Sequence, residues 1–251
     1  MALMAEELQL NGKTAVVTGA AAGIGAAIAH MFAAQGARVV LADRDAGPLR
    51  ATAAVIGPNA LPIVCDVGDT GSVAALAATA LASGPVDILV NNAGVYPRRP
   101  FLEMTEEDWD TIHNINLKGV FRCCRALLPS MAARGSGKIV NISSVTFHLG
   151  MANLVHYVAS KGGIIGLTRS LAREFGPSGI HVNCITPGAV LVEHEKDVTS
   201  QDDRRYFVSQ QCLPRRILPL DIARAALFLA TPLSDAITGQ TLNVDGGWHM
   251  H

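Results

Sequence analysis

The chain has 251 residues, of which 49% are hydrophobic and 16% charged, and its formal net charge is −1. Such an apolar fraction with a net charge near zero excludes an intrinsically disordered chain. The balance of 20 Lys and Arg against 21 Asp and Glu excludes the broad basic surface with which a nucleic-acid-binding protein neutralises phosphates.

Short, mostly apolar runs rich in β-branched residues alternate with Ala- and Leu-rich segments of helical period. The predicted elements are, in chain order, strand Lys13–Thr18, helix Ile24–Gln35, strand Ala37–Ala42, helix Pro48–Val55, strand Ala60–Cys65, helix Thr70–Ala82, strand Val86–Val90, helix Glu106–Ala133, strand Lys138–Ile142, helix Leu154–Phe175, strand His181–Ile185, helix Leu220–Ala230 and strand Thr241–Val244. Thr105, with Asp108 three residues later, is typical of a helix start. The alternation predicts an α/β fold with one doubly wound parallel sheet and helices on both of its faces.

Nothing along the chain marks a second domain. No linker-like Gly/Ser or Pro run and no internal repeat interrupts it, so residues 1–251 are expected to form a single domain. The segments Glu106–Ala133 and Leu154–Phe175 carry small or apolar residues on more than one face and are candidates for subunit contacts. Residues 190–216 are polar, charged and poorly periodic, which predicts a lid over a site.

The N-terminus and the cysteines indicate a cytoplasmic protein. Met1–Glu7 is acidic, whereas a secretory signal needs a basic start. The five cysteines are odd in number and none lies in a Cys-x-x-Cys spacing, so buried thiols are expected rather than disulfides or a zinc site. Gly, Pro or charged residues interrupt every apolar stretch before the roughly 20 residues of a membrane-spanning helix.

A glycine-rich turn follows the first predicted strand, from Thr18 to Gly25, and opens a predicted helix. Glycines allow a tight turn and close backbone approach, and the helix N-terminus favours a phosphate group. The spacing is Gly-x-x-x-Gly-x-Gly rather than the commoner Gly-x-Gly-x-x-Gly. The turn predicts a dinucleotide site formed by Gly19, Ala22, Gly23, Ile24 and Gly25.

The charge at the end of the second strand favours NAD over NADP. Asp43 lies where a carboxylate accepts hydrogen bonds from the adenosine ribose and repels a 2′-phosphate. Arg44 is the competing feature, since it could stack on adenine or pair with a phosphate, but Ala22 offers no cation within the turn. Further cofactor contacts are expected after the third and fourth strands, at Asp66, Val67, Asn92, Ala93 and Gly94.

Tyr157 and Lys161 are four residues apart on one predicted helix, so their side chains share a face. A free tyrosine has a pKa of about 10, and a nearby cation stabilises its anion. Such a pair is also common on a solvated helix face. Ser144, which follows a predicted strand, and Asn116 upstream make the catalytic interpretation the stronger one.

Together these motifs resemble those of the short-chain dehydrogenase/reductases of about 250 residues, from about Leu10 to Gly247. The motifs that carry the resemblance are Thr18–Gly25, Asn91–Gly94, Asn114–Gly119, Asn141–Ser144, Tyr157 with Lys161, Asn183, Pro187–Gly188, Thr238–Gln240 and Asp245–Gly247. The resemblance implies a Rossmann fold, a nicotinamide cofactor and hydride transfer to or from a carbinol carbon.

The resemblance also implies a role for each catalytic residue. Tyr157 would be the general base in oxidation and the acid in reduction, and Ser144 would hold the substrate oxygen. Lys161 would lower the pKa of Tyr157 and bind the nicotinamide ribose, and Asn116 would position a water that relays protons. Pro187, Gly188 and Val190 would add cofactor contacts. The chain departs from the family at Val192, where a threonine usually contacts the nicotinamide carboxamide.

The expected substrate contacts are Tyr96, Ser144, Thr146, His148 and Tyr157, with Gly150, Leu154 and His156 nearby. Around Tyr96 and His156 the sequence resembles family members that oxidise aryl-substituted secondary alcohols. Around Thr146 and Lys161 it resembles pyridoxal-type and sugar dehydrogenases. The resemblance therefore implies an aryl alcohol, a sugar or a polyol as the expected substrate class.

Three functions stay open. The favoured one is an NAD-dependent dehydrogenase of secondary alcohols. The second is an NADP-dependent 3-oxoacyl-carrier ketoreductase, for which Arg122 and Arg125 could attract an acidic carrier. The third is a non-catalytic nucleotide-binding regulatory protein, which Tyr157 and Lys161 argue against. No metal ion, nucleic acid or membrane partner is expected, and the resemblance implies a homotetramer, to which the amphipathic Trp248–His251 tail could contribute.

Overall fold

In the computed structural model, which describes residues 7–193 and 200–250, seven strands form one parallel sheet in the order β3-β2-β1-β4-β5-β6-β7. The strands are β1 (Thr14–Thr18), β2 (Arg38–Asp43), β3 (Ala60–Val64), β4 (Ile88–Asn91), β5 (Gly137–Ile142), β6 (Ile180–Pro187) and β7 (Thr241–Val244). The order reverses between β1 and β4. In such sheets ligands bind at the carboxyl ends of the strands beside this reversal. The predicted doubly wound parallel sheet is confirmed.

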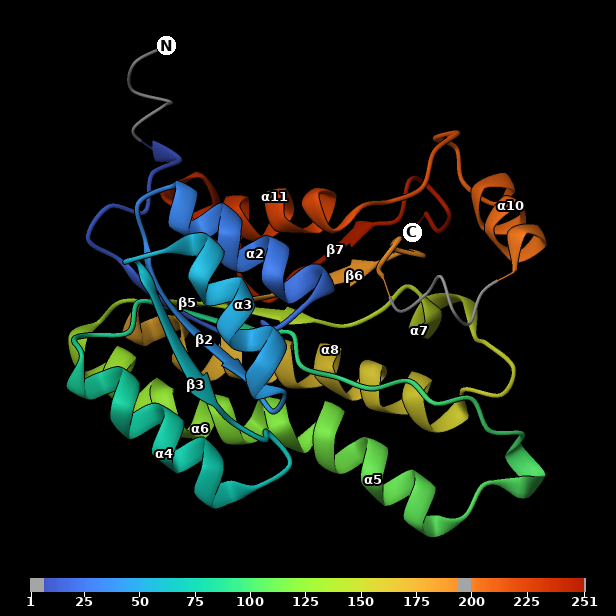
Figure 1. Cartoon of the computed structure of the whole chain (residues 1–251), viewed down its shortest axis with the longest axis horizontal. Coiled ribbons are helices and arrows are strands. Elements are labelled where there is room, and N and C mark those ends of the chain that lie inside the picture. Colours follow the sequence, from blue (N-terminus) through green and yellow to red (C-terminus); the bar gives the residue numbers. More distant parts are fainter. Residues whose placement is uncertain (1–6, 194–199, 251) are drawn as a thin grey trace.

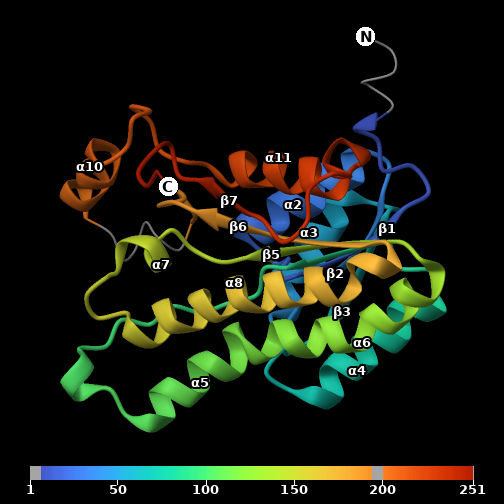
Figure 2. The same ribbon diagram turned by 180° about the vertical axis from the view of Figure 1, so that it is seen from behind.

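Helices cover both faces of the sheet (Figures 1 and 2). The helices are α2 (Gly23–Ala34), α3 (Ala46–Ile56), α4 (Thr70–Ala82), α5 (Glu106–Asn116), α6 (Lys118–Arg134), α7 (Thr146–Leu149), α8 (Val155–Phe175), α10 (Gln201–Ser209) and α11 (Pro219–Ala230), with short 3-10 turns at Phe101–Glu103, Gly176–Ser178 and Pro232–Ser234. In both views α2, α3 and α11 lie on one face, and α4, α5, α6 and α8 lie on the other.

The hydrophobic core lies in two layers, one on each face of the sheet. Successive side chains of a strand point to opposite faces. Val16 of β1 therefore belongs to the layer shared with Leu127 of α6, whereas Val17 belongs to the layer shared with Phe32 of α2. All five residues of β1 are buried, which explains why the sequence of this strand has no polar face.

The predicted single helix Glu106–Ala133 is wrong, because it is two helices that meet at Leu117. Both helices bury one face against the same layer, so the hydrophobic period continues across the break and does not reveal it. The capping box of Thr105 and Asp108 is present at the start of α5 as predicted.

The segment predicted as an irregular lid contains a helix. Ser200 and Asp203 form a capping box at the start of α10, a two-turn helix that the weak periodicity concealed. Val190 pairs with Ile217 in an isolated bridge that holds the two ends of the segment together. Figure 1 places α10 and α7 at the same end of the molecule, beyond β5 and β6. Residues 194–199 of the predicted lid lie outside the described residues.

Candidate active site

The turn between β1 and α2 brings backbone groups close together. Gly19 has a φ of +66°, and a Cβ atom there would lie 2.8 Å from the Ala93 Cα atom. A Cβ atom at Gly25 would overlap the Gly19 carbonyl oxygen. The side chain of the N-cap residue Ala22 makes no capping bond, and the first turn of α2 has no acidic residue. The first N–H groups of α2 are therefore free of side-chain acceptors and suit an anion.

Asp43 ends β2 beside this turn. One carboxylate oxygen accepts a hydrogen bond from the Ala21 N–H at 3.0 Å, and the other accepts one from the Asp45 N–H at 3.1 Å. The neighbouring Arg44 guanidinium lies 3.9 Å from the Asp45 carboxylate, and its side chain is 62% exposed. The turn thus places a fixed negative charge at this end of the site, while the nearest cation pairs with Asp45.

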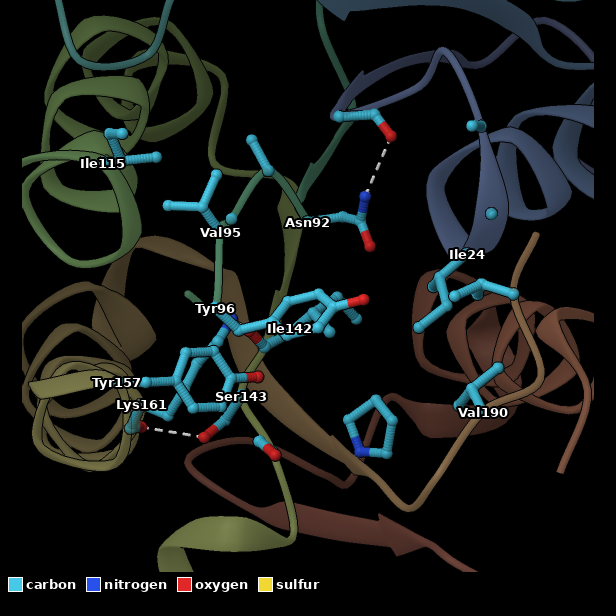
Figure 3. A pocket seen from close by; sticks show the side chains of 18 of the residues that line it. Ile24, Asn92, Val95, Tyr96, Ile115, Ile142, Ser143, Tyr157, Lys161 and Val190 are labelled. Atoms are coloured by element: carbon cyan, nitrogen blue, oxygen red, sulfur yellow. Dashed lines mark hydrogen bonds between the residues drawn. The ribbon is translucent and has the colours of Figure 1, made fainter. Parts of the chain in front are cut away.

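A cavity of about 610 Å³ extends from the glycine-rich turn to Tyr157 (Figure 3). The predicted residues that line it are Gly19, Ala22, Gly23, Ile24, Asp43, Arg44, Asp66, Val67, Asn92, Ala93, Gly94, Pro187, Gly188, Val190, Lys161, Tyr96, Ser144, Thr146 and Tyr157. Segments from nearly the whole length of the chain meet here, because the carboxyl ends of parallel strands lie at one edge of the sheet.

Three residues predicted for the site do not line the cavity. Gly25 packs against Gly19 beneath the turn. Asn116 is fully buried behind the cavity wall. The His148 ring stacks on the His249 ring with 4.6 Å between centroids and 12° between planes, so the structure places it against the C-terminal segment rather than in the cavity. The nearby Gly150 and His156 also lie outside the lining.

Tyr157 and Lys161 lie one turn apart on α8, as their spacing predicts. The Lys161 Nζ atom lies 5.6 Å from the centre of the Tyr157 ring and donates a hydrogen bond to the Ile142 carbonyl oxygen at 2.9 Å. Burial lowers the pKa of Lys161 to about 8. Burial raises the pKa of Tyr157 to about 12, although the hydrogen bond with Ser144 acts in the opposite direction. A phenolate at this position near neutral pH therefore needs further positive charge.

The end of β5 positions the hydroxyl groups that face this pair. The Ser143 hydroxyl donates to the Lys161 carbonyl oxygen at 2.8 Å, which ties the strand end to α8. Ser144, only 7% exposed, follows it and lines the cavity beside Tyr157. Figure 3 shows Tyr157 and Lys161 coming from α8 and Ser143 from the neighbouring strand end. A substrate oxygen in this part of the cavity would meet both a phenol and an alcohol.

Asn116 holds the loop that follows β4. Its side-chain oxygen accepts from the Val95 N–H at 2.8 Å, and its amide nitrogen donates to the Val95 carbonyl oxygen at 2.9 Å and to the Ser160 hydroxyl at 3.3 Å. A Cβ atom at Gly94 would lie 3.2 Å from the Asn116 oxygen and 3.4 Å from Lys161 Nζ. Asn116 thus fixes the loop that lies beside Lys161.

Val192, the departure from the family pattern, packs on the glycine-rich turn. Its Cγ1 atom lies 3.3 Å from the position that a Cβ atom would take at Gly23. The valine side chain therefore covers the turn with an apolar contact where the family usually has a hydroxyl group.

Two aromatic side chains at the substrate side of the cavity were not predicted from the sequence. Phe207 of α10 and Trp248 of the C-terminal segment both line the cavity, with 5.8 Å between their ring centroids. Arg98, Met151 and Glu193 line it as well. No local motif marks these residues, because their place depends on how the lid and the tail fold back.

Within 7–193 and 200–250, no three His, Cys, Asp or Glu side chains are grouped so as to hold a metal ion. The helices in the same ranges are too short or too polar to cross a membrane.

Comparison with known proteins supplies the class of chemistry. Residues 19–249 match a family model described as enoyl-(acyl carrier protein) reductase. A D-xylose 1-dehydrogenase of Caulobacter vibrioides is 38% identical over 239 residues, which are 95% of this chain and 96% of that protein. A 3-oxoacyl-(acyl-carrier-protein) reductase of Vibrio harveyi is 37% identical over 244 residues, covering 97% of this chain and all of that protein.

A solved structure has the same fold. A chain described as a short chain dehydrogenase/reductase family protein superimposes with a TM-score of 0.89 at 39% sequence identity, and the match covers 95% of this chain and 98% of that chain. The shared fold thus extends over nearly the whole chain.

Proposed function

Because this chain belongs to the short-chain dehydrogenase/reductase family and is therefore an oxidoreductase of alcohol and ketone groups, we propose that it is an NAD-dependent dehydrogenase of a secondary alcohol of aryl, sugar or polyol type. The family implies a nicotinamide cofactor. The choice of NAD, the substrate class and the roles of the individual residues are the proposal.

The residues of the cavity fit a nicotinamide dinucleotide. The turn has no side chains at Gly19 and Gly25, where a Cβ atom would meet backbone, and the N-terminus of α2 suits a diphosphate. Asp43, Asp66 and Val67 would hold the adenosine end, and Asn92, Gly94, Pro187, Gly188 and Val190 would hold the other half. An oxidised nicotinamide bound by these residues would supply the hydride acceptor for oxidation at the carbinol carbon.

The single observation that carries the choice of NAD is the placement of Asp43. Its carboxylate lies 3.0 Å from the Ala21 N–H at the glycine-rich turn, where it can accept from ribose hydroxyls and repels a 2′-phosphate. The Arg44 guanidinium, which would be needed beside a phosphate, pairs instead with Asp45 at 3.9 Å.

In the proposed oxidation, the Tyr157 phenolate takes the proton of the substrate hydroxyl, and Ser144 donates a hydrogen bond to the substrate oxygen. Lys161, buried on the same face of α8, supplies positive charge that favours the phenolate. In reduction the Tyr157 phenol returns the proton. The water-positioning role that the family implies for Asn116 stays a proposal, since the bonds to Val95 and Ser160 occupy its amide.

The substrate side of the cavity supports a substrate with a flat or apolar face. Tyr96, Phe207 and Trp248 line it together with Met151 and Leu154. Aromatic rings accept aryl groups and also the C–H faces of sugars, and the similarity to a D-xylose 1-dehydrogenase supports the latter. Ser144 supplies a hydroxyl group for orientation, and Thr146 lines the cavity beside it.

The second candidate, an NADP-dependent 3-oxoacyl-carrier ketoreductase, is favoured by the similarity to the Vibrio harveyi reductase. However, the Arg122 guanidinium donates hydrogen bonds to Thr70, Val67 and Asn114 within the chain, so these donors are already used and are not left for a carrier. Arg125 lies over the Phe121 ring at 5.9 Å. The non-catalytic alternative is disfavoured because Ser144, Tyr157 and Lys161 meet in one cavity.

We further propose that the protein acts in the cytoplasm as a homotetramer on a small-molecule substrate, without nucleic-acid or membrane partners. Trp109 of α5 and Phe121 of α6 are 38% and 45% exposed, and this pair of large apolar side chains on two helices that pack together supports a subunit interface there.

The proposal is tested by comparing kcat/KM for NAD and NADP with the same secondary alcohol. We expect NAD to be preferred at least tenfold, which corresponds to about 1.4 kcal/mol. Asp43→Asn, which removes the charge and keeps the shape, is expected to reduce the preference. A tenfold preference for NADP would reject the proposal and favour the ketoreductase.

A further inference from the structure

Thr146 forms two hydrogen bonds to a single atom of Ser144. Its backbone N–H donates to the Ser144 Oγ atom at 3.2 Å, and its side-chain hydroxyl lies 2.9 Å from the same Oγ atom as a second donor. Thr146 is the first residue of α7, which begins two residues after Ser144. Both residues line the cavity.

These contacts determine what Ser144 can do with its own hydrogen. A serine hydroxyl has two lone pairs and one hydrogen. The two donors of Thr146 occupy both lone pairs, so any further hydrogen bond of Ser144 must be one that it donates. Ser144 and Tyr157 both line the cavity. The Ser144 hydrogen is therefore left for an acceptor in this part of the cavity, where a substrate oxygen would lie.

We infer that Thr146 is a positioning residue that makes Ser144 a dedicated hydrogen-bond donor to the substrate oxygen. The inference rests on the proposed oxidation. It differs from a direct substrate contact of Thr146, because the threonine hydroxyl acts through Ser144.

The consequence for the reaction is electrostatic. When Tyr157 takes the hydroxyl proton, negative charge develops on the substrate oxygen, and a donor that is already aimed at this oxygen stabilises the transition state without reorientation. Without the Thr146 hydroxyl, one lone pair of Ser144 is left open. Ser144 can then rotate its hydrogen away and accept a bond from the substrate hydroxyl instead, which does not stabilise the developing charge.

Two substitutions test the contribution of the Thr146 hydroxyl separately from that of the rest of the side chain. Thr146→Val keeps the shape and the backbone N–H bond and removes only the hydroxyl. We expect it to lower kcat about tenfold, because Ser144 no longer keeps its donor aimed at the oxygen on which charge develops, and to leave the KM for NAD unchanged. Thr146→Ser restores the hydroxyl and is expected to return kcat to within about twofold of the wild type.

A double-mutant cycle tests whether Thr146 acts through Ser144. In a Ser144→Ala background the inference predicts that Thr146→Val changes kcat by less than about twofold, because the atom it acts on is gone. An equal loss of kcat in both backgrounds would instead show a direct contact of Thr146 with the substrate and overturn the inference. An unchanged kcat for Thr146→Val in the wild-type background would overturn it too.

Thr231→Val is the control for loss of a buried hydroxyl. The Thr231 hydroxyl donates to the Phe228 carbonyl oxygen at 3.0 Å at the end of α11, away from the cavity, and this variant is expected to keep the wild-type kcat.

Failure of the proposed function looks different from failure of the inference. The former is a wild-type protein that oxidises no alcohol, whereas the latter is an active wild type, inactive on Tyr157→Phe substitution, whose Thr146→Val variant behaves normally.

Discussion

At the scale of single residues, α8 contains a lysine whose positive charge is unfavourable to bury. Lys161 is 4% exposed, and burial lowers its pKa from 10.5 to about 8. The folded protein therefore gains stability when this lysine loses its proton. A buried cation of this kind is typical of a functional site rather than of a residue kept for stability.

This burial predicts a pH-dependent difference in stability between the wild type and Lys161→Met. Between the folded pKa of about 8 and the unfolded pKa of 10.5, the unfolded chain binds more protons at Lys161 than the folded chain does. The free energy of unfolding contributed by this residue thus rises with pH in that window, by at most about 1.4 kcal/mol per pH unit. Lys161→Met lacks this rise.

Urea unfolding of both proteins at several pH values across that window measures the difference. We expect the stability of the wild type to increase relative to that of Lys161→Met as the pH rises. Tyr157 is present in both proteins, so its own titration largely cancels. Two curves that stay parallel throughout the window would contradict a depressed pKa of Lys161.

Residue-scale predictions from the sequence succeeded where local geometry decides the outcome. Tyr157 and Lys161 share a face because helical spacing of four requires it. The placement of His148 was not predictable in the same way, since its stacking on His249 depends on the path of a C-terminal segment about one hundred residues later in the chain. Phe207 and Trp248 were missed for the same reason.

At the scale of elements, the turn between β1 and α2 is packed backbone against backbone. A Cβ atom at Gly25 would overlap the Gly19 carbonyl oxygen, and no side-chain rotation can relieve such a contact. These atoms form the proposed diphosphate site. A substitution in the turn is therefore expected to weaken cofactor binding more than it affects the rest of the site.

We therefore predict that Gly25→Ala weakens NADH binding at least tenfold, since the turn must shift to admit the methyl group. Gly47→Ala is the matched control, because outside its chain neighbours and the backbone of its own helix no atom lies within 4 Å of a Cβ atom at that position in α3. It is expected to bind NADH as the wild type does. Fluorescence titration with NADH measures both variants, and wild-type affinity in Gly25→Ala would contradict the packing argument.

The elements themselves were predictable where periodicity is strong and uninterrupted. All seven strands were expected from buried β-branched runs, and each overlaps an observed strand. The break at Leu117 and the helix α10 were not expected. A one-residue break leaves the apolar period intact, and a two-turn helix with a polar face resembles an irregular loop.

At the scale of the whole molecule, the order of the strands places the site. The reversal between β1 and β4 opens the crevice in which the glycine-rich turn, Asn92 and Tyr157 meet. Alternation of strands and helices predicted a doubly wound parallel sheet, whereas the order of its strands was not predicted. No comparable rule predicts where the lid and the C-terminal segment lie, although Phe207 and Trp248 of these segments line the substrate side of the cavity.

The assembly is the prediction that belongs to this scale. We expect light scattering after size-exclusion chromatography to give the mass of four chains. Phe121→Asp, which puts a charge on the exposed apolar surface of α6, is expected to yield smaller species because a buried unpaired carboxylate disfavours the interface. A wild-type protein that elutes as a monomer would contradict the proposed homotetramer.

The central claim is that Tyr157 abstracts the proton of a secondary alcohol while NAD is reduced, and its most direct test is turnover. Formation of NADH is measured for the wild type and Tyr157→Phe with a panel of aryl, sugar and polyol alcohols. The account predicts turnover of at least one class by the wild type, a loss of about a thousandfold or more in Tyr157→Phe, and similar NADH affinity in both. Equal rates in the two proteins would contradict it.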